Sequence, residues 1–565
     1  MNRREFLKNV GASGMVLVAP TTLSSKASAA ELAPVGKYFV YAHLGGGWEP
    51  TTFCNPKGNQ LRGNVGANLG IDAGSVRNAG SPVNRYPASA IRKAADIYTG
   101  SASISSEMAY APYLGTFNRS GPNGELDDGA ANEGLTTRHI QKILSGDYDA
   151  GSETLTAESD ATFDWKVSKT AAEIQANAKR ILESMASNGN SSMTVDLNDI
   201  TSELTDRNLD NAVSGGNPSG NYFVYDAFVC LYADLMRVLN GVDNRTNSHS
   251  TGTQYADTGS MAMGYPDFSA LYSAVKGADR PLAWMTDGSG NNESAGLVAR
   301  SSAADADIFD ILADPTRDRD ADLNQHMTSS FRPFLDRANA ARERLQAQQE
   351  NLPLRRQYQD QLYLVRAQGS QFTDTANVIN QPEPGTLAEE VLKAANSGTQ
   401  RHMRVGAAGF STGMASSMQV GFGGFDTHGD HDNNHYPRIR RVLVDLHFLF
   451  RALEAYGVLN QTTIVVGSDF GRTPWYNDGD GKDHWAVTSY LLFGNGVSGG
   501  TSVQATNGLV EARNVNTSNL QAVSSGGTLM TASHLHLALR KFAGIQNHEY
   551  SLEFPIDAED MPMLG

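Results

Sequence analysis

Residues 423–485 carry the strongest functional pattern in the chain. They read G-G-F-D-T-H-G-D-H over 423–431, T-T-I-V-V-G-S-D-F-G-R-T over 462–473 and G-D-G-K-D-H-W over 479–485. Carboxylates and imidazoles follow apolar segments there, at Asp426, His428, Asp469 and His484. Side chains of this type, converging from loops that follow strands, are what a hydrolytic metal site requires. The stretch therefore predicts a metal centre at the ends of strands.

The segments around this stretch predict an α/β fold. The β-branched run 462–467 is typical of a parallel strand buried on both faces, and residues 37–44 have the composition of a first core strand. Residues 436–456 form an amphipathic helical pattern that Gly457 ends. Strands and helices alternate along the chain, which favours a layered domain with a mainly parallel central sheet flanked by helices.

The remaining elements complete one domain over residues 30–565. Further strands are expected at 280–285, 403–411, 419–425 and 489–493, and further helices at 156–186, 222–242, 385–397 and 529–542. Two insertions are expected: a polar one at about 187–264, with an exposed Ser/Thr/Gly-rich loop over 244–264, and a helical one at about 304–371.

The charge balance limits the partners. The chain has 45 basic and 61 acidic residues, a net charge of −16. Such a surface repels nucleic acid and anionic lipid, and an anionic substrate would need local positive charge at its site. The chain has two cysteines, Cys54 and Cys230. They either form one disulfide or remain two buried free thiols, and the sequence does not decide between these alternatives.

Residues 1–29 have the features of an export signal. Asn2-Arg3-Arg4-Glu5-Phe6-Leu7-Lys8 resembles a twin-arginine motif, and Ala27-Ser28-Ala29 supplies a cleavage site. The apolar stretch 10–20 is shorter than a membrane span, and no later stretch is long and apolar enough to be one. We therefore expect the twin-arginine translocase to deliver the chain to the periplasm or beyond; an ordinary N-terminal helix is the alternative.

Three more residues are candidates for the site. Glu49 follows the first strand in G-G-G-W-E, where glycines allow close backbone approach to a ligand. Thr136 lies near the start of a helix, as a nucleophile beside free amides or as a simple N-cap. Arg472 is placed to hold an anionic ester oxygen bidentately, or to form a structural ion pair. The histidines of 428–435 have a plain alternative as a solvated loop.

Together these motifs resemble a known family. The leader, G-G-G-W-E, G-G-F-D-T-H, G-V-L-N-Q-T-T-I-V-V-G-S-D-F-G-R-T-P and G-K-D-H are similar to the exported bacterial family labelled domain of unknown function 1501, over about residues 38–554. That family in turn resembles the alkaline phosphatase/sulfatase superfamily. The resemblance implies that superfamily's layered fold and the hydrolysis of phosphate or sulfate esters.

The resemblance also implies a ligand set. Glu49 takes the position of a first metal-binding acid, and Thr136 that of the nucleophile. Asp426 and His428 resemble a D…H ligand pair, for which His431 competes with His428. Asp469 in S-D-F-G and His484 in G-K-D-H resemble the later ligands.

Two departures from the superfamily pattern affect one metal of its pair. Phe470 stands where a histidine ligand is usual, and Glu49 replaces an aspartate. Asp426, His428 and His484 remain, so the sequence predicts one competent divalent metal (Zn, Mn, Mg or Ca).

The expected function is an exported metal-dependent hydrolase acting on a small anionic ester or an anionic glycan. A metal supplies nucleophile at neutral pH because it lowers the pKa of water from about 15.7 to about 7. The alternative is a catalytically degenerate member of the fold that serves as a binding or assembly protein of the cell envelope.

Overall fold

The computed structural model describes residues 35–55, 235–302, 329–349 and 369–565, apart from 476, 478, 480 and 508, with isolated positions at 179, 182–183, 228 and 231–232. The expected signal segment, Thr136 and Cys230 lie outside these residues. Cys54 lies within them as a buried free thiol, and burial raises its pKa.

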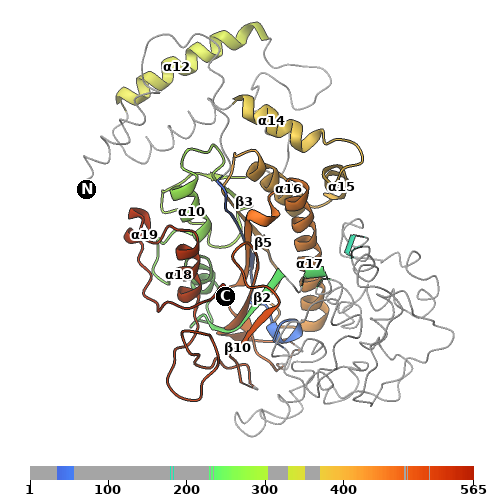
Figure 1. The fold of residues 1–565 in the computed structure, drawn as a ribbon, viewed down its shortest axis with the longest axis vertical. Coiled ribbons are helices and arrows are strands. Elements are labelled where there is room, and N and C mark those ends of the chain that lie inside the picture. The colour runs from blue at the N-terminus through green and yellow to red at the C-terminus, as the bar shows by residue number, and fades with distance from the viewer. Residues whose placement is uncertain are drawn as a thin grey trace, which may run out of the picture.

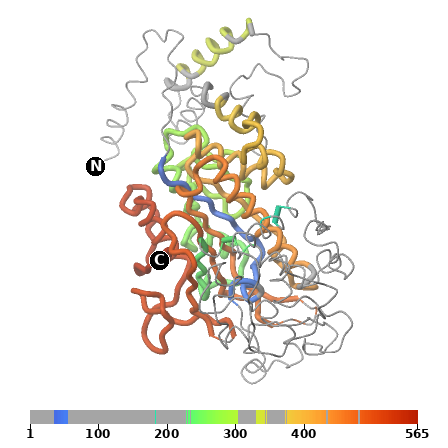
Figure 2. Tube along the Cα trace, turned by 45° about the vertical axis from the view of Figure 1, so that its right-hand side comes forward, coloured from blue at the N-terminus to red at the C-terminus, as the bar shows by residue number. Residues whose placement is uncertain are grey.

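An eight-stranded sheet forms the centre of the described chain, in the order β10-β2-β9-β6-β1-β5-β3-β4. Strand β1 (Tyr38–Leu44) pairs in parallel with both β5 (Ser417–Phe422) and β6 (Thr462–Ser468). Figure 2 shows this N-terminal strand, in blue, among segments from the C-terminal half. Strand β9 (Val487–Gly494) is antiparallel to both its neighbours, and the other pairs are parallel. The sheet confirms the coarser expectation of an α/β fold with a mainly parallel central sheet.

The other strands lie toward the edges of this sheet or form a separate hairpin. The strands toward the edges are β2 (Met236–Asp243), β3 (Trp284–Thr286), β4 (Arg300–Ser301) and β10 (Thr501–Gln504). A two-stranded antiparallel sheet pairs β7 (Gly471–Arg472) with β8 (His484–Trp485).

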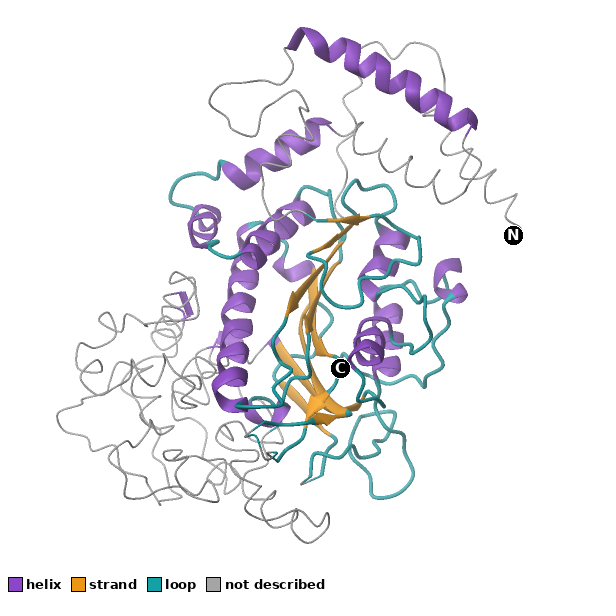
Figure 3. Ribbon diagram, turned by 180° about the vertical axis from the view of Figure 1, so that it is seen from behind, coloured by secondary structure: helices purple, strands orange, loops and turns teal. Residues whose placement is uncertain are grey.

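Helices cover both faces of the sheet, as Figures 1 and 3 show. Val40 and Ala42 of β1 belong to an apolar cluster shared with α14 (Gly369–Asn380), α15 (Leu387–Ala394), α16 (Gly398–Ser411) and α17 (His431–Ala455). Phe39 and Tyr41 belong to a cluster on the other face, shared with α9 (His249–Thr258), α10 (Phe268–Lys276) and α18 (Ala532–Phe542). Because successive side chains of a strand alternate, β1 contributes to both cores.

Several expected elements are confirmed with small shifts at their ends. They are the strands expected at 37–44, 419–425, 462–467 and 489–493 and the helices expected at 385–397, 436–456 and 529–542. The short elements not yet named are η1 (Pro50–Thr52), η6 (Ser329–Phe331), η7 (Leu459–Gln461) and α19 (Glu549–Glu553).

The strand expected over 403–411 is wrong, because these residues belong to helix α16. A capping box starts this helix: the Ser397 side chain accepts from the Gln400 amide, and the Gln400 side chain accepts from the Ser397 amide. The alternation of small and apolar residues comes from packing against the sheet. A Cβ on Gly406 would lie 2.3 Å from the Met418 sulfur on β5, so this helix face needs small residues.

The helix expected over 222–242 is confirmed at Phe228, Leu231 and Tyr232, which are helical, but it is wrong from Met236 onward, and the exposed loop expected over 244–264 is wrong over 249–258. Residues 236–243 form strand β2, which pairs with β9 and β10 inside the sheet. Residues 249–258 form helix α9, with Tyr255 and Ala256 buried. The small polar residues of α9 mark a tight contact, since a Cβ on Gly252 would lie 2.5 Å from the Asp469 carbonyl oxygen. The C-terminal part of the expected polar insertion thus belongs to the core layers.

Helix α12 (Arg332–Gln349) lies in the expected helical insertion and, in Figure 1, apart from the sheet. Phe334 and Leu345 on this helix, and Phe331 just before it, are exposed. No described helix combines the length and the apolar character that crossing a bilayer requires.

Candidate metal centre

The candidate site lies where three parallel strands end. Asp469 follows β6 directly, the turn Gly45-Gly46-Gly47 follows β1, and Asp426 lies four residues beyond the end of β5. Because parallel neighbours end at the same edge of a sheet, their following loops meet there. The sheet order β6-β1-β5 therefore brings together residues that are distant in sequence.

Three imidazoles converge on one carboxylate oxygen. The Asp426 Oδ1 atom lies 3.5 Å from His249 Nε2, 3.2 Å from His428 Nε2 and 3.6 Å from His484 Nε2. The Nε2 atoms of His428 and His484 are 2.9 Å apart. Among the described residues, His249, Asp426 and His484 form a group whose ligand atoms all lie within 4.8 Å of one another. Of the sequence candidates, Asp426, His428 and His484 are brought together.

Each imidazole comes from a different kind of element. His249 is the first residue of helix α9, and His428 lies in the turn before α17. His484 lies on β8, directly opposite Arg472 of β7 in the small hairpin. The two side chains of such an antiparallel pair point to the same face.

The Nδ1 atom of every one of these rings faces a hydrogen-bond acceptor. His249 Nδ1 lies 2.6 Å from Asp469 Oδ2, and His428 Nδ1 lies 2.8 Å from Asp483 Oδ1. His484 Nδ1 lies 2.7 Å from the Asn247 carbonyl oxygen. An acceptor at Nδ1 keeps the proton there, so in the neutral ring the lone pair of Nε2 points at the cluster. Metal-binding histidines are commonly oriented in this way, by a hydrogen-bond partner on the ring nitrogen that does not bind the metal.

This arrangement fits a metal ion. The lone pairs of two neutral imidazoles that face each other across 2.9 Å repel, and a cation bound by both nitrogens removes this repulsion. His484 is suited to this role because burial lowers its pKa, which keeps the ring neutral. The Nε2 atom of His249 is buried and has no hydrogen-bond partner within the described part of the chain. Three imidazoles and one carboxylate are an ordinary donor set for a divalent transition metal.

Arg472 does not have the geometry of a substrate clamp. Its guanidinium is fully buried. Nε donates to the Gly47 carbonyl, Nη1 to the Lys482 carbonyl and toward His428, and Nη2 to the Gly46 carbonyl and Asp426. These acceptors occupy all five N–H groups of an arginine. The predicted bidentate binding of an ester conflicts with this structure, and the alternative of a structural ion pair is the one observed. Burial raises the pKa of Asp426, but the pairing with Arg472 outweighs this effect. The pKa is therefore below its usual value, and the carboxylate is ionised.

The other two acids predicted as ligands have different partners. Asp469 is buried and accepts from the Gly46 amide in addition to facing His249, so it orients a ligand histidine. Glu49 is buried 3.6 Å from Lys482 Nζ, and its carboxylate accepts from the Thr51 amide. Neither belongs to the group of residues that converge on Asp426 Oδ1.

Phe470 and His431 are not among the side chains that converge on Asp426 Oδ1. The buried Phe470 ring packs on the rings of His249 and His484, with centroids 4.7 Å and 4.4 Å away. His431, the competitor of His428, is fully buried, lies 2.7 Å from Thr427 Oγ1 and stacks on His435. Burial lowers the pKa of His431 and of His435 well below the usual value, so both are neutral.

A scan of family models matches residues 230–536 to the family described as protein of unknown function DUF1501. The match covers 307 of the 565 residues, more than half of the chain. The chain belongs to this family. A search of curated proteins and a search of solved structures found no match.

The DUF1501 match contains the whole convergent cluster, from His249 to His484, and excludes Glu49 and Thr136. His249 was missed in the sequence because it lies in a Ser/Thr-rich segment without apolar periodicity. Two local features of the sequence could have pointed to His249. It directly follows Ser248, and Gly252 in the same segment allows close packing.

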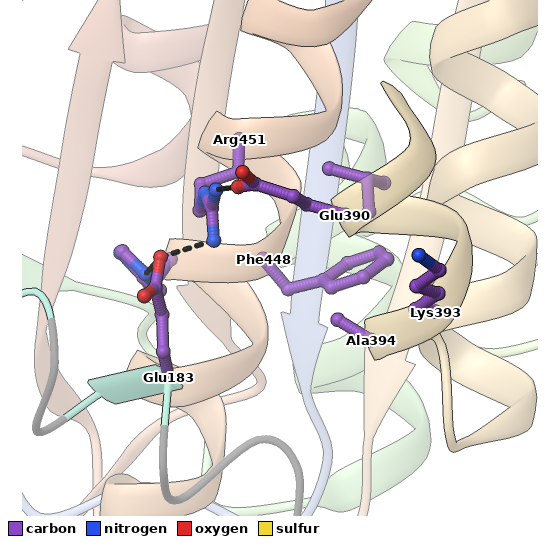
Figure 4. A pocket seen from close by; sticks show the side chains of 8 residues that line it. Glu183, Glu390, Lys393, Ala394, Phe448 and Arg451 are labelled. Carbon is purple, nitrogen blue, oxygen red and sulfur yellow. Dashed lines mark hydrogen bonds and ion pairs between the residues drawn. The ribbon is translucent and has the colours of Figure 1, made fainter. Parts of the chain in front are cut away.

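A separate pocket of about 470 Å³ lies between α15 and α17, and Figure 4 shows its lining. Arg451 of α17 is held there between the carboxylates of Glu183 and Glu390. This pocket lies along helices of the outer layer, and its lining includes none of the residues of the metal centre.

Proposed function

We propose that the chain is an exported hydrolase of phosphate or sulfate esters that uses a single divalent metal. The observation that carries this proposal is the convergence of three Nε2 atoms on Asp426 Oδ1 at the ends of parallel strands. An alkaline phosphatase-like arrangement of the layers, and export through the twin-arginine pathway to the periplasm or the exterior, are parts of the same proposal.

In this proposal His249, Asp426, His428 and His484 hold the metal. Imidazole-rich sets favour zinc and related transition metals, whereas magnesium and calcium prefer all-oxygen sets. Zinc is therefore the first choice among the four metals expected from the sequence. When bound, such a metal polarises an ester oxygen and lowers the pKa of water.

The protein's own residues do the positioning. Asp469, Asp483 and the Asn247 carbonyl fix the ring orientations, and Arg472 fixes Asp426. Arg472 is paired with Asp426, so a bound divalent metal would supply the net positive charge that an anionic ester needs beside the acidic body. Thr136, outside the described residues, remains the predicted nucleophile. Small anionic esters and anionic glycans remain the predicted substrates.

A binding or assembly role in the cell envelope is the second candidate. The Arg472–Asp426 ion pair favours this second candidate, because Arg472 already neutralises the carboxylate at the centre of the cluster without a metal. In that case the cluster would stabilise the loops at the strand ends and turn over no substrate.

Metal content and ester hydrolysis, measured on the same preparations, separate the two candidates. We expect about one zinc per wild-type chain by elemental analysis and hydrolysis of an aryl phosphate or an aryl sulfate. His249→Ala and His484→Ala should each lose both properties. His548→Ala changes a half-buried histidine that caps α19, away from the cluster, and is the matched control. A metal-loaded wild type that cleaves neither ester would contradict the hydrolase and favour the second candidate.

A further inference from the structure

A buried ion pair lies next to the metal centre. Lys482 Nζ is 3.6 Å from Glu49 Oε1, and both side chains are fully buried. Removing two charges from water carries a large desolvation cost, and apolar replacements of buried pairs are often neutral or stabilising. The contribution of this pair to overall stability is therefore a weak explanation for it, and its connections point to another role.

The backbone of Lys482 connects the parts of the site. Its amide donates to the carbonyl of Thr427, the residue between Asp426 and His428, over 3.0 Å. Its carbonyl accepts from Arg472 Nη1 over 2.9 Å. The next two residues are Asp483, which orients His428, and the cluster member His484. The place of Lys482 thus sets the position of three of the four convergent side chains.

Glu49 connects the pair to the turn after β1. Its amide donates to His435 Nε2 over 2.9 Å, and its carboxylate accepts from the Thr51 amide over 3.0 Å. Just before it, the carbonyls of Gly46 and Gly47 accept from Arg472. The ion pair therefore joins the 481–484 loop to the glycine turn at the end of the central strand.

We propose that the Lys482–Glu49 ion pair is the positioning element of the metal centre. It holds the loop that carries His484 and Asp483 at the distance from β1 at which the Nε2 atoms converge. Glu49 then acts through Lys482 as its buried counter-ion. The inference rests on the metal centre of the proposed function but not on ester hydrolysis.

Zinc affinity, measured on chelator-treated protein by competition with a chromogenic chelator, tests this role. The variants are Lys482→Met, Glu49→Gln and the double variant Glu49→Gln/Lys482→Met, each with a thermal melt of the metal-free form. Lys393→Met removes an exposed lysine from a surface pair with Glu389 on α15 and is the matched control. We expect zinc affinity to fall about 10- to 100-fold in all three variants, as for removal of a ligand-orienting partner, and to stay unchanged in the control.

The double variant separates positioning from charge balance. Either single variant removes one member of the pair and leaves the other charge buried, which should lower the melting temperature, whereas the double variant removes both charges and should recover most of it. A double variant with both wild-type stability and wild-type zinc affinity would overturn the proposal. A stable double variant with weakened zinc binding supports it even if the single variants do not fold. Wild-type chain that binds zinc but hydrolyses no ester contradicts the hydrolase alone.

Discussion

At the scale of single residues, the partner of each ring nitrogen separates metal-binding histidines from structural ones. The stretch 426–435 holds His428, His431 and His435 within eight positions. Only His428 turns its Nε2 to Asp426, while the other two are buried and stacked under the turn. The composition of the stretch predicted a cluster of ligands. It could not assign the roles, because these depend on where the turn ends and α17 begins.

The same limit applies to Asp469 and Arg472. Their positions after a buried strand were predictable from the β-branched run that precedes them, and both do lie at the site. Their roles were not, because Asp469 binds the Nδ1 of His249, a residue more than two hundred positions away. A motif places a side chain at the end of its strand, but its partner comes from another element.

His43 on β1 gives a residue-scale prediction about pH. Its Nδ1 lies 2.8 Å from Asp257 Oδ1 of α9, and both side chains are buried. Burial lowers the pKa of His43, but Asp257, with Asp469 and Asp267 nearby, raises it to about 9 from 6.5. Because the pKa is raised, protonated His43 contributes to the free energy of unfolding. This contribution is fully present below pH 6.5 and is lost as the pH rises through 9. At about 1.36 kcal/mol per pKa unit, the loss is roughly 3 kcal/mol.

Urea unfolding of metal-free protein between pH 6 and pH 9.5 measures this loss. The variant His43→Gln/Asp257→Asn replaces the ion pair by neutral groups of similar size. Its unfolding free energy should depend less on pH than that of the wild type, with the two curves converging at high pH. Parallel curves for the two proteins would show that His43 does not titrate in this range.

At the scale of elements, the apolar pattern predicted those parts of the fold that are buried by large side chains. The run 462–467 and the stripe of 436–456 are examples, and both are where the sequence placed them. Helices α9 and α16 were misread because they pack through small residues such as Gly252 and Gly406. Glycine and alanine at a tight interface remove the periodicity on which a helix prediction depends.

Gly252 therefore carries a prediction about helix α9. A Cβ at this position would lie 2.5 Å from the Asp469 carbonyl oxygen, so Gly252→Ala must push the helix away from the end of β6. His249 lies one turn earlier on the same helix and would move with it. We expect a destabilisation of about 1–3 kcal/mol in urea unfolding, as for other overpacked sites, together with weaker zinc binding by chelator competition.

Gly398→Ala is the control for this change. Gly398 begins helix α16, and a Cβ added there would have no atom of the described residues within 4 Å. Alanine at this position should be neutral or stabilising by about 0.4–1 kcal/mol, because it restricts the unfolded chain. If Gly252→Ala behaved like Gly398→Ala, the packing of α9 against Asp469 would be looser than described.

At the scale of the whole molecule, an acidic body encloses two buried cations, each paired with a carboxylate. The chain has a net charge of −16, yet Arg472 and Lys482 are both fully buried within the loops at the strand ends. Each is held by a carboxylate, Asp426 or Glu49, that comes from a loop after β5 or β1. The loops at the strand ends are thus linked by two buried ion pairs. These loops should therefore gain the most protection from hydrogen exchange when a metal binds.

Hydrogen exchange with and without zinc tests this link between the site and the fold. At a free zinc concentration one hundred times the dissociation constant, binding stabilises the native state by about 2.7 kcal/mol. We expect the added protection in the loops over 423–430 and 470–485 and in the first turn of α9, because their side chains converge on Asp426 Oδ1. Peptides from the exposed helix α12 serve as the internal control and should exchange equally in both states. Protection spread evenly over all peptides, or confined to α17, would contradict a metal centre at the strand ends.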